Sequence, residues 1–141
     1  MGSKRSLALV IEDDRDIARL FACAVQEAGF VTEVAHCGES AMLWLLSFTP
    51  DVVVLDIHLP RVEGKDILGY IRGEDRLADT RVIVATADPA FADSFRNNED
   101  VDLVLVKPIS FDQLRDLSER ICQEPPTAAT RVSTFAGSLL P

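Results

Sequence analysis

The nine residues VVVLDIHLP, at positions 52–60, decide the fold. Val52 to Leu55 form an apolar run without polar alternation, which predicts a strand that is buried on both faces. The run ends at Asp56, and Pro60 marks the loop that follows. A strand of this kind belongs to a parallel sheet covered by helices on both faces, because an antiparallel sheet with one wet face shows alternation.

Four more apolar runs flank this one and alternate with helical patterns. The predicted strands are 7–11, 31–35, 52–55, 81–85 and 103–106. The predicted helices are an amphipathic stripe ended by Gly29, then 41–48, 67–71, a short and poor helix at 89–97, and a helix capped by Ser110 with Gln113 reaching back. Five such strands in about 120 residues predict an α/β fold: a flavodoxin-like, doubly wound (βα)5 arrangement with a five-stranded parallel sheet in the order 2-1-3-4-5.

Size and charge narrow the class of protein. The chain has 141 residues, of which 48% are hydrophobic and 26% charged, so it predicts one globular domain and excludes a disordered polymer or a two-domain enzyme. Its 14 basic and 23 acidic residues give a net charge of −9, which argues against direct binding to nucleic acid. We expect the domain to occupy residues 1–123, and residues 124–141, with Pro125-Pro126, to be a flexible tail or the stub of a linker.

The apolar runs and the cysteines of the sequence predict where the protein is located and whether it contains disulfides. No apolar run approaches the roughly 18 residues that span a bilayer, and the start of the chain lacks the apolar core of a signal peptide. We therefore expect a cytoplasmic protein without a membrane partner. Cys23, Cys37 and Cys122 are odd in number and widely spaced, which predicts reduced, part-buried side chains and neither a disulfide framework nor a zinc site.

Polar residues follow four of the predicted strands, at the point where each strand ends. They are Glu12 and Asp13, Asp56, Thr86 and Lys107. In the order 2-1-3-4-5, strands one, three, four and five are neighbours, and the ligand site of such a sheet lies beyond their carboxyl ends. We therefore expect these side chains to converge on one crevice.

The chemistry of this set suggests a metal and a phosphoryl group. Clustered carboxylates raise one another's pKa unless a cation compensates, and Mg²⁺ prefers oxygen ligands and commonly bridges carboxylates to a phosphate. Lys107 can balance a carboxylate or a phosphoryl oxygen, and the Thr86 hydroxyl can donate to another such oxygen. An aspartate between a metal and a lysine is a credible phosphoryl acceptor. Asp14 is interpreted separately, as the N-cap of the first helix.

The order and spacing of these motifs resemble the receiver domain of two-component response regulators. The matching residues are Glu12-Asp13, Asp56 to Pro60 with Gly64, Thr86-Ala87 and Lys107-Pro108, and the resemblance covers residues 7 to 122. It implies that Asp56 accepts a phosphoryl group from the phosphohistidine of a histidine kinase or phosphotransfer protein. The domain would catalyse its own phosphorylation and dephosphorylation, as a signalling module of a phosphorelay and not an ordinary enzyme.

The resemblance also implies roles for individual residues. Asp13 and Asp56 would bind Mg²⁺ directly and Glu12 through water, and the backbone carbonyl of His58 would complete the protein ligands. Lys107 would pair with the acyl phosphate, and Thr86 would move toward it. In addition, Ala87 would leave space for the phosphoryl group, and the peptide bond before Pro108 would be cis.

The implied output is a change of partner binding on the face formed by strand 4, helix 4, strand 5 and helix 5. Partners through that face would be a downstream effector protein, an output domain beyond the C-terminus, or a second copy in a homodimer. The chain departs from the family at Val104, where receiver domains place a tyrosine or phenylalanine three residues before the lysine, and at 98–100, where a glycine-alanine turn is usual. Both departures fall on the output side.

Three alternative functions have distinct requirements. An aspartate-nucleophile phosphatase needs a second carboxylate two residues after the nucleophile, where this chain has His58. A flavin-binding protein of this fold needs phosphate-cradling Ser, Thr or Gly after the first strand, where this chain has acids. A pseudo-receiver that only docks partners would be favoured by a missing acceptor or lysine, and Asp56 and Lys107 are both present.

Overall fold

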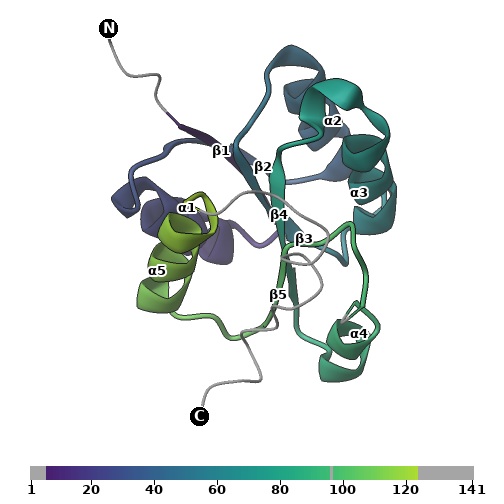
Figure 1. Cartoon of the computed structure of the whole chain (residues 1–141). Helices are drawn as coiled ribbons and strands as arrows, with labels where there is room; N and C mark the ends of the chain where they lie inside the picture. Colours follow the sequence, from purple (N-terminus) through teal and green to yellow (C-terminus); the bar gives the residue numbers. More distant parts are fainter. Residues whose placement is uncertain (1–5, 96, 124–141) are drawn as a thin grey trace, which may run out of the picture.

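The fold is a five-stranded parallel sheet with helices on both faces, seen in a computed structural model that describes residues 6–95 and 97–123 (Figure 1). The strands lie in the order β2-β1-β3-β4-β5, which confirms the predicted doubly wound topology. In chain order the elements are β1 (Leu7–Ile11), α1 (Arg15–Glu27), β2 (Val31–Ala35), α2 (Gly38–Ser47), β3 (Val52–Asp56), α3 (Gly64–Gly73), a 3₁₀ turn η1 (Asp75–Leu77), β4 (Arg81–Thr86), α4 (Pro89–Asp93), β5 (Leu103–Val106) and α5 (Phe111–Ile121).

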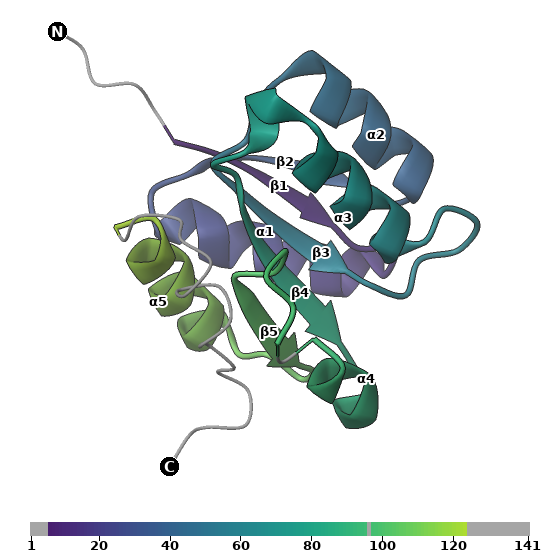
Figure 2. The ribbon, with the colours of Figure 1, turned by 45° about the vertical axis from the view of Figure 1, so that its right-hand side comes forward.

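Two apolar cores lie on opposite faces of the sheet. On one face α1 and α5 pack over the sheet, with Phe21, Val25 and Leu114 among the buried residues. On the other face α2, α3 and the short α4 pack over it, with Leu45 and Ile67 among the buried residues (Figure 2). All five residues of β3 are buried, as expected for a central strand with both faces covered.

Helix ends follow the local sequence where a side chain can cap them. Asp14 caps α1, because its Oδ1 accepts hydrogen bonds from the backbone N–H groups of Asp16 and Ile17, both at 3.0 Å. Gly29, with φ of +108°, follows the C-terminal end of this helix. At α5 the hydroxyl of Ser110 accepts from the N–H of Gln113 at 3.0 Å, as predicted.

Three predicted helices have different bounds in the structure. Helix α3 extends beyond the predicted 67–71 at both ends, from Gly64 to Gly73. Helix α2 begins at Gly38, three residues before the predicted start, and no side chain caps it. At this start the helix lies against the loop after β3, where a Cβ on Gly38 would lie 2.4 Å from Cβ of Val62. Helix α4 ends at Asp93, four residues earlier than predicted. There the N–H and hydroxyl of Ser94 both donate to the carbonyl of Phe91, so a turn replaces the helix.

The structure also bears on the predictions about membrane-spanning helices and cysteines. Within the described residues, no helix has the length and apolarity to cross a membrane. Cys37 and Cys122 are half-buried and free, as predicted, whereas Cys23 is exposed, because it lies on the outer face of α1. The predicted tail, residues 124–141, lies outside the described residues.

Candidate functional site

The parallel register brings the predicted polar residues to one edge of the sheet. Asp56 is the last residue of β3 and pairs with Ala85 of β4, and Thr86 pairs with Val106 of β5. Glu12 and Asp13 directly follow β1, and Lys107 directly follows β5. Because all four strands point the same way, these side chains meet beyond their carboxyl ends.

Three carboxylates form the floor of this site. Carboxylate oxygens of Glu12, Asp13 and Asp56 all lie within 4.8 Å of one another. Glu12 and Asp56 are buried, with 1% and 5% of their surface exposed, while Asp13 is exposed at the rim. Buried like charges at this spacing are unfavourable unless a cation compensates.

Lys107 supplies a positive charge to the two buried carboxylates. Its Nζ donates a 2.7 Å hydrogen bond to Oε1 of Glu12 and lies 3.5 Å from Oδ2 of Asp56. Its backbone N–H donates to the carbonyl of Thr86 at 2.7 Å, and its peptide bond to Pro108 is cis, as the resemblance implied. The lysine is thereby held between the acids by both backbone and side chain.

The electrostatics of the pair follow from burial and contact. Burial is the largest influence on Glu12, and together with the charge of Asp56 it outweighs the lowering effect of the hydrogen bond from Lys107, so the pKa rises from 4.5 to about 7. For Lys107, burial lowers the pKa, but the hydrogen bond to Glu12 and the charge of Asp56 outweigh it, so the pKa lies above its ordinary value. Near neutral pH the site therefore holds an ammonium beside a carboxyl group that is poised between its two protonation states.

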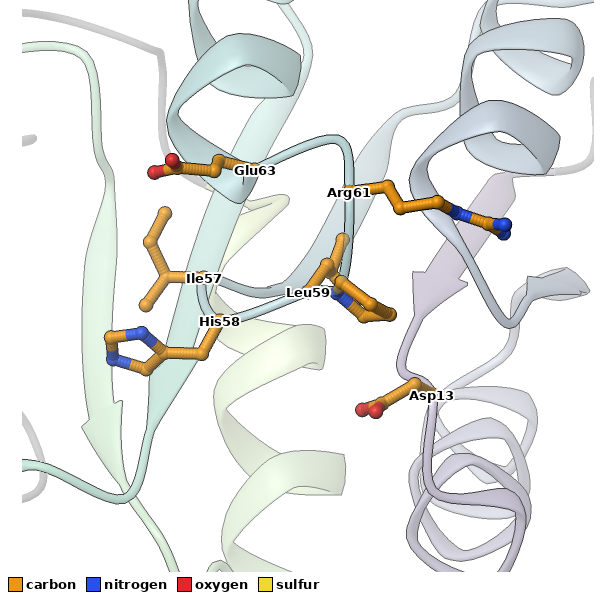
Figure 3. A pocket seen from close by; sticks show the side chains of 7 residues that line it. Asp13, Ile57, His58, Leu59, Arg61 and Glu63 are labelled. Carbon is orange, nitrogen blue, oxygen red and sulfur yellow. The ribbon is translucent and has the colours of Figure 1, made fainter.

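The carboxylate cluster has the donor chemistry of a magnesium site. Oxygen-only ligands from Glu12, Asp13 and Asp56, with space at an exposed rim for waters, match the preference of this hard cation. The His58 ring points away from Asp13 (Figure 3), so its imidazole takes no part in this cluster. The backbone N–H of His58 donates to Oδ1 of Asp56 at 3.0 Å and fixes the orientation of that carboxylate.

A cleft of about 510 Å³ opens beside the acids, lined by Asp13 and by residues 57–61 and 63 of the loop after β3 (Figure 3). The loop has close contacts at two points. Arg61, with φ of 66°, forms a 3.3 Å ion pair with Glu39 of α2, and Gly64 lies so close to Ile57 that a Cβ there would be 2.6 Å from the Cα of Ile57. The approach to Asp56 is therefore shaped by a loop that closely touches both α2 and α3.

The remaining residues that the sequence singled out, two beside the phosphoryl site and Val104 on the output side, have clear positions. Thr86 is fully buried, and its Oγ1 accepts a 3.1 Å hydrogen bond from the N–H of Asp88. Ala87, the next residue, is exposed. Val104 is 2% exposed and belongs to the core on the side of α4, where Ala92 and Phe95 also lie.

Two neighbours of the site carry no signal in the sequence. His36, which we interpreted as an edge-strand residue, lies just after β2, and its Nδ1 is 3.1 Å from the backbone carbonyl of Glu12. The ring of Phe91 on α4 packs edge-on against the ring of His58, with centroids 4.6 Å apart. Both contacts join segments more than 20 residues apart, so local patterns do not predict them.

A doubly wound α/β fold with an acid cluster and a lysine at its strand ends defines the class of protein. Residues 8–119 match the family model described as the response regulator receiver domain, so the chain belongs to that family. This is the signalling module of two-component systems, and the resemblance noted from the sequence is confirmed.

Curated relatives extend this result. The chain is 33% identical over 107 residues to the transcriptional regulatory protein TrcR and 29% identical over 107 residues to the response regulator MprA, both of Mycobacterium tuberculosis. Each alignment covers 75% of this chain, but only 41% of TrcR and 46% of MprA. The chain thus spans less than half the length of these relatives.

Solved structures of response regulators have the same fold as this chain. The receiver domain of the Francisella response regulator 1452 is 27% identical, with a TM-score of 0.73 over 84% of this chain and 97% of that one. The chemotaxis response regulator CheY4 of Vibrio cholerae shares the fold at 20% identity, with a TM-score of 0.72 over 84% of this chain and 99% of that one.

Proposed function

We propose that Asp56 is the phosphoryl acceptor of a Mg²⁺-dependent receiver domain, with a histidine kinase or a phosphotransfer protein as the donor. The observation that carries the proposal is the environment of Asp56: a buried carboxylate with Lys107 3.5 Å away and two further carboxylates within 4.8 Å. A nucleophilic carboxylate between a cation site and an ammonium is suited to attack a phosphorus atom.

In the proposed transfer, an oxygen of Asp56 forms a bond to phosphorus as the P–N bond of the phosphohistidine breaks, and the leaving imidazole takes up a proton. A bound Mg²⁺ would be held by Asp13 and Asp56, with Glu12 acting through water and the His58 carbonyl as a further ligand, and would neutralise charge on the phosphoryl oxygens. Lys107 donates to one phosphoryl oxygen and Thr86 to another, and the small Ala87 leaves room for the group. These residues position and neutralise, so no separate base is required.

Regulation follows from the same assignment. The phosphorylated domain changes partner binding on the face of β4, α4, β5 and α5, which would meet an effector protein, an output domain or a second copy of the chain. The proposed receiver domain comprises residues 1–123, with 124–141 as a tail or linker, in a cytoplasmic protein. The share of its longer relatives that this chain covers is compatible with an output domain in a longer protein.

The test is labelling with a small phosphodonor. The full chain is incubated with Mg²⁺ and acetyl phosphate, and its intact mass is measured beside Asp56→Asn and beside a sample with EDTA. We expect the mass of one phosphoryl group on the wild-type chain and none in either control. If the wild-type chain takes no label and Mg²⁺ also fails to bind, the chain is instead a docking-only pseudo-receiver.

A further inference from the structure

We propose that Phe91, on the short helix α4, couples the phosphorylation of Asp56 to a rearrangement of α4. The inference rests on the proposed function, because it needs a phosphoryl group on Asp56. It assigns a positioning role to a side chain that does not touch the reacting atoms.

The surroundings of Phe91 connect three segments of the chain. Its ring centroid lies 4.6 Å from that of His58 in the loop after β3, with the rings at 67° to each other. On α3, Lys65 places its Nζ 5.3 Å from the same ring, within the range of a cation–π contact. Phe95 packs against Phe91 from the core side, with centroids 5.4 Å apart. A movement of His58 therefore meets the Phe91 ring directly.

The first connection to Asp56 runs through His58. The backbone N–H of His58 donates to Oδ1 of Asp56 at 3.0 Å. Bonding one Asp56 oxygen to phosphorus converts the carboxylate into an acyl phosphate, whose remaining oxygen is a weaker hydrogen-bond acceptor than an ionised carboxylate. The strength of this hydrogen bond thus changes with phosphorylation, and the His58 ring is carried on the same residue.

The second connection runs through Thr86. Its Oγ1 accepts from the N–H of Asp88 at 3.1 Å, and Oδ1 of Asp88 in turn caps α4 by accepting from the N–H groups of Ala90 and Phe91 at 3.0 and 3.3 Å. A Thr86 hydroxyl that turns toward a phosphoryl oxygen stretches its bond to Asp88 and disturbs the cap. Both connections end on Phe91, one at its ring and one at its backbone.

Helix α4 is an element that such small changes can move. It has only five residues, far below the roughly 12 that an isolated helix needs, so its stability comes from its cap and its packing. Strand β5, with the sequence LVLV, offers α4 no aromatic side chain, and Val104 is already buried in the core. The aromatic side chain of α4 is Phe91, and its ring contacts His58, whose backbone N–H is the hydrogen-bond donor to Asp56.

The test separates phosphorylation from its conformational readout. The ¹⁵N-labelled chain of 141 residues is phosphorylated with acetyl phosphate and Mg²⁺. Intact mass reports the label on Asp56, and backbone amide shifts report on α4 residues 90–93. The variants are Phe91→Leu, which removes the ring, Phe91→Tyr, which keeps it, and Phe111→Leu as the matched control. Phe111 is a half-buried aromatic residue on α5 that contacts Arg115.

We expect Phe91→Leu to be phosphorylated as fully as the wild type, with shift changes in α4 at least about threefold smaller, since the two states of α4 then differ less. Phe91→Tyr and Phe111→Leu should respond like the wild type. Shift changes of wild-type size in Phe91→Leu, or an equal loss in Phe111→Leu, overturn the inference while the proposed function stands. Absence of label on wild-type Asp56 overturns both.

A measurement on the wild type alone guards against a variant that does not fold. Side-chain resonances of the Phe91 and His58 rings should shift on phosphorylation, because their mutual ring currents depend on the 4.6 Å contact. Unchanged ring resonances in a protein whose mass shows full phosphorylation overturn the inference without any substitution.

Discussion

Replacing Lys107 with Ala should destabilise the protein by an amount that grows with pH. The lysine contacts two buried carboxylates, Glu12 at 2.7 Å and Asp56 at 3.5 Å, and its loss leaves both without that cation. A buried charge that loses its partner is costly unless the group takes up a proton. Glu12, whose pKa is already about 7, can do so at mildly acidic pH and not at alkaline pH.

The sign of the pH effect follows from the proton count. Folding raises the pKa of Glu12 from 4.5 to about 7, so between these values the folded state binds more protons than the unfolded state. The free energy of unfolding therefore falls as pH rises through this window, by about 3 kcal/mol in all. Without Lys107, which lowers this pKa, the pKa moves higher and the fall continues above pH 7.

The magnitude can be set from the same values. Each pH unit by which the fall continues above pH 7 costs Lys107→Ala about 1.4 kcal/mol more than the wild type, so its extra loss between about pH 5.5 and pH 8.5 is up to about 2 kcal/mol. The assay is urea unfolding with EDTA at both pH values, followed by the fluorescence of the single tryptophan, Trp44. Lys65→Ala, which removes an exposed lysine of α3, is the matched control and should show the same small change at both pH values. Equal destabilisation of Lys107→Ala at both pH values would refute the reasoning.

Three further outcomes test the loop, the core and the acid cluster. Gly64→Ala should lower the free energy of unfolding by about 2 kcal/mol and slow labelling by acetyl phosphate, because the new Cβ meets Ile57 next to the acceptor. Gly69→Ala on the same helix has open space and should raise the free energy of unfolding by about 0.5–1 kcal/mol. Urea titrations of both variants measure these changes. Val104→Tyr should cost about 1–3 kcal/mol by overfilling the core yet leave the labelling rate near that of the wild type, so a large loss of rate would contradict the separation of chemistry from readout. Mg²⁺ at about 100 times its Kd should stabilise the wild type by about 2.7 kcal/mol in thermal unfolding, and a gain of the same size in Asp13→Asn would argue against the carboxylate cluster as the site.

The sequence predicted the sheet and the positions of the site residues because both depend on strong local patterns. Short apolar runs rich in β-branched residues, such as Val52 to Leu55, favour strands buried on both faces, and once the strand order is set, the residues after neighbouring parallel strands lie at one edge of the sheet. The predicted start of α2 was wrong because no capping side chain marks the start of this helix in the sequence. The helix instead starts at Gly38, in close contact with Val62, and no periodicity records a contact between residues so far apart in the sequence.

Side-chain contacts across the site were beyond sequence reasoning for the same reason. The sequence places a histidine two residues after Asp56, but the path of the loop decides that its ring faces Phe91 and not the acids. Likewise the crowding of three carboxylates was expected, whereas the near-complete burial of Glu12 involves contacts between distant segments: its N–H donates to the carbonyl of Ala35 in β2, and its carboxylate meets Lys107 after β5. That burial, more than the neighbouring charge, raises its pKa.

In the proposed signalling, the charge would change at one place in the fold, the strand ends, and would be read at another, helix α4. Glu12 and Asp56 are held by Lys107 in a buried network, where adding or removing one charge shifts a balance of several kcal/mol. Helix α4, by contrast, has only five residues and is held by the Asp88 cap, the buried Ala92 and the half-buried ring of Phe91, so its position depends on a few contacts. A change of charge in the buried network of carboxylates and Lys107 would then alter the contacts of α4 and so change the surface of the protein. Substitutions at the strand ends should therefore alter whether the domain is phosphorylated, and substitutions around Phe91 should alter what phosphorylation does.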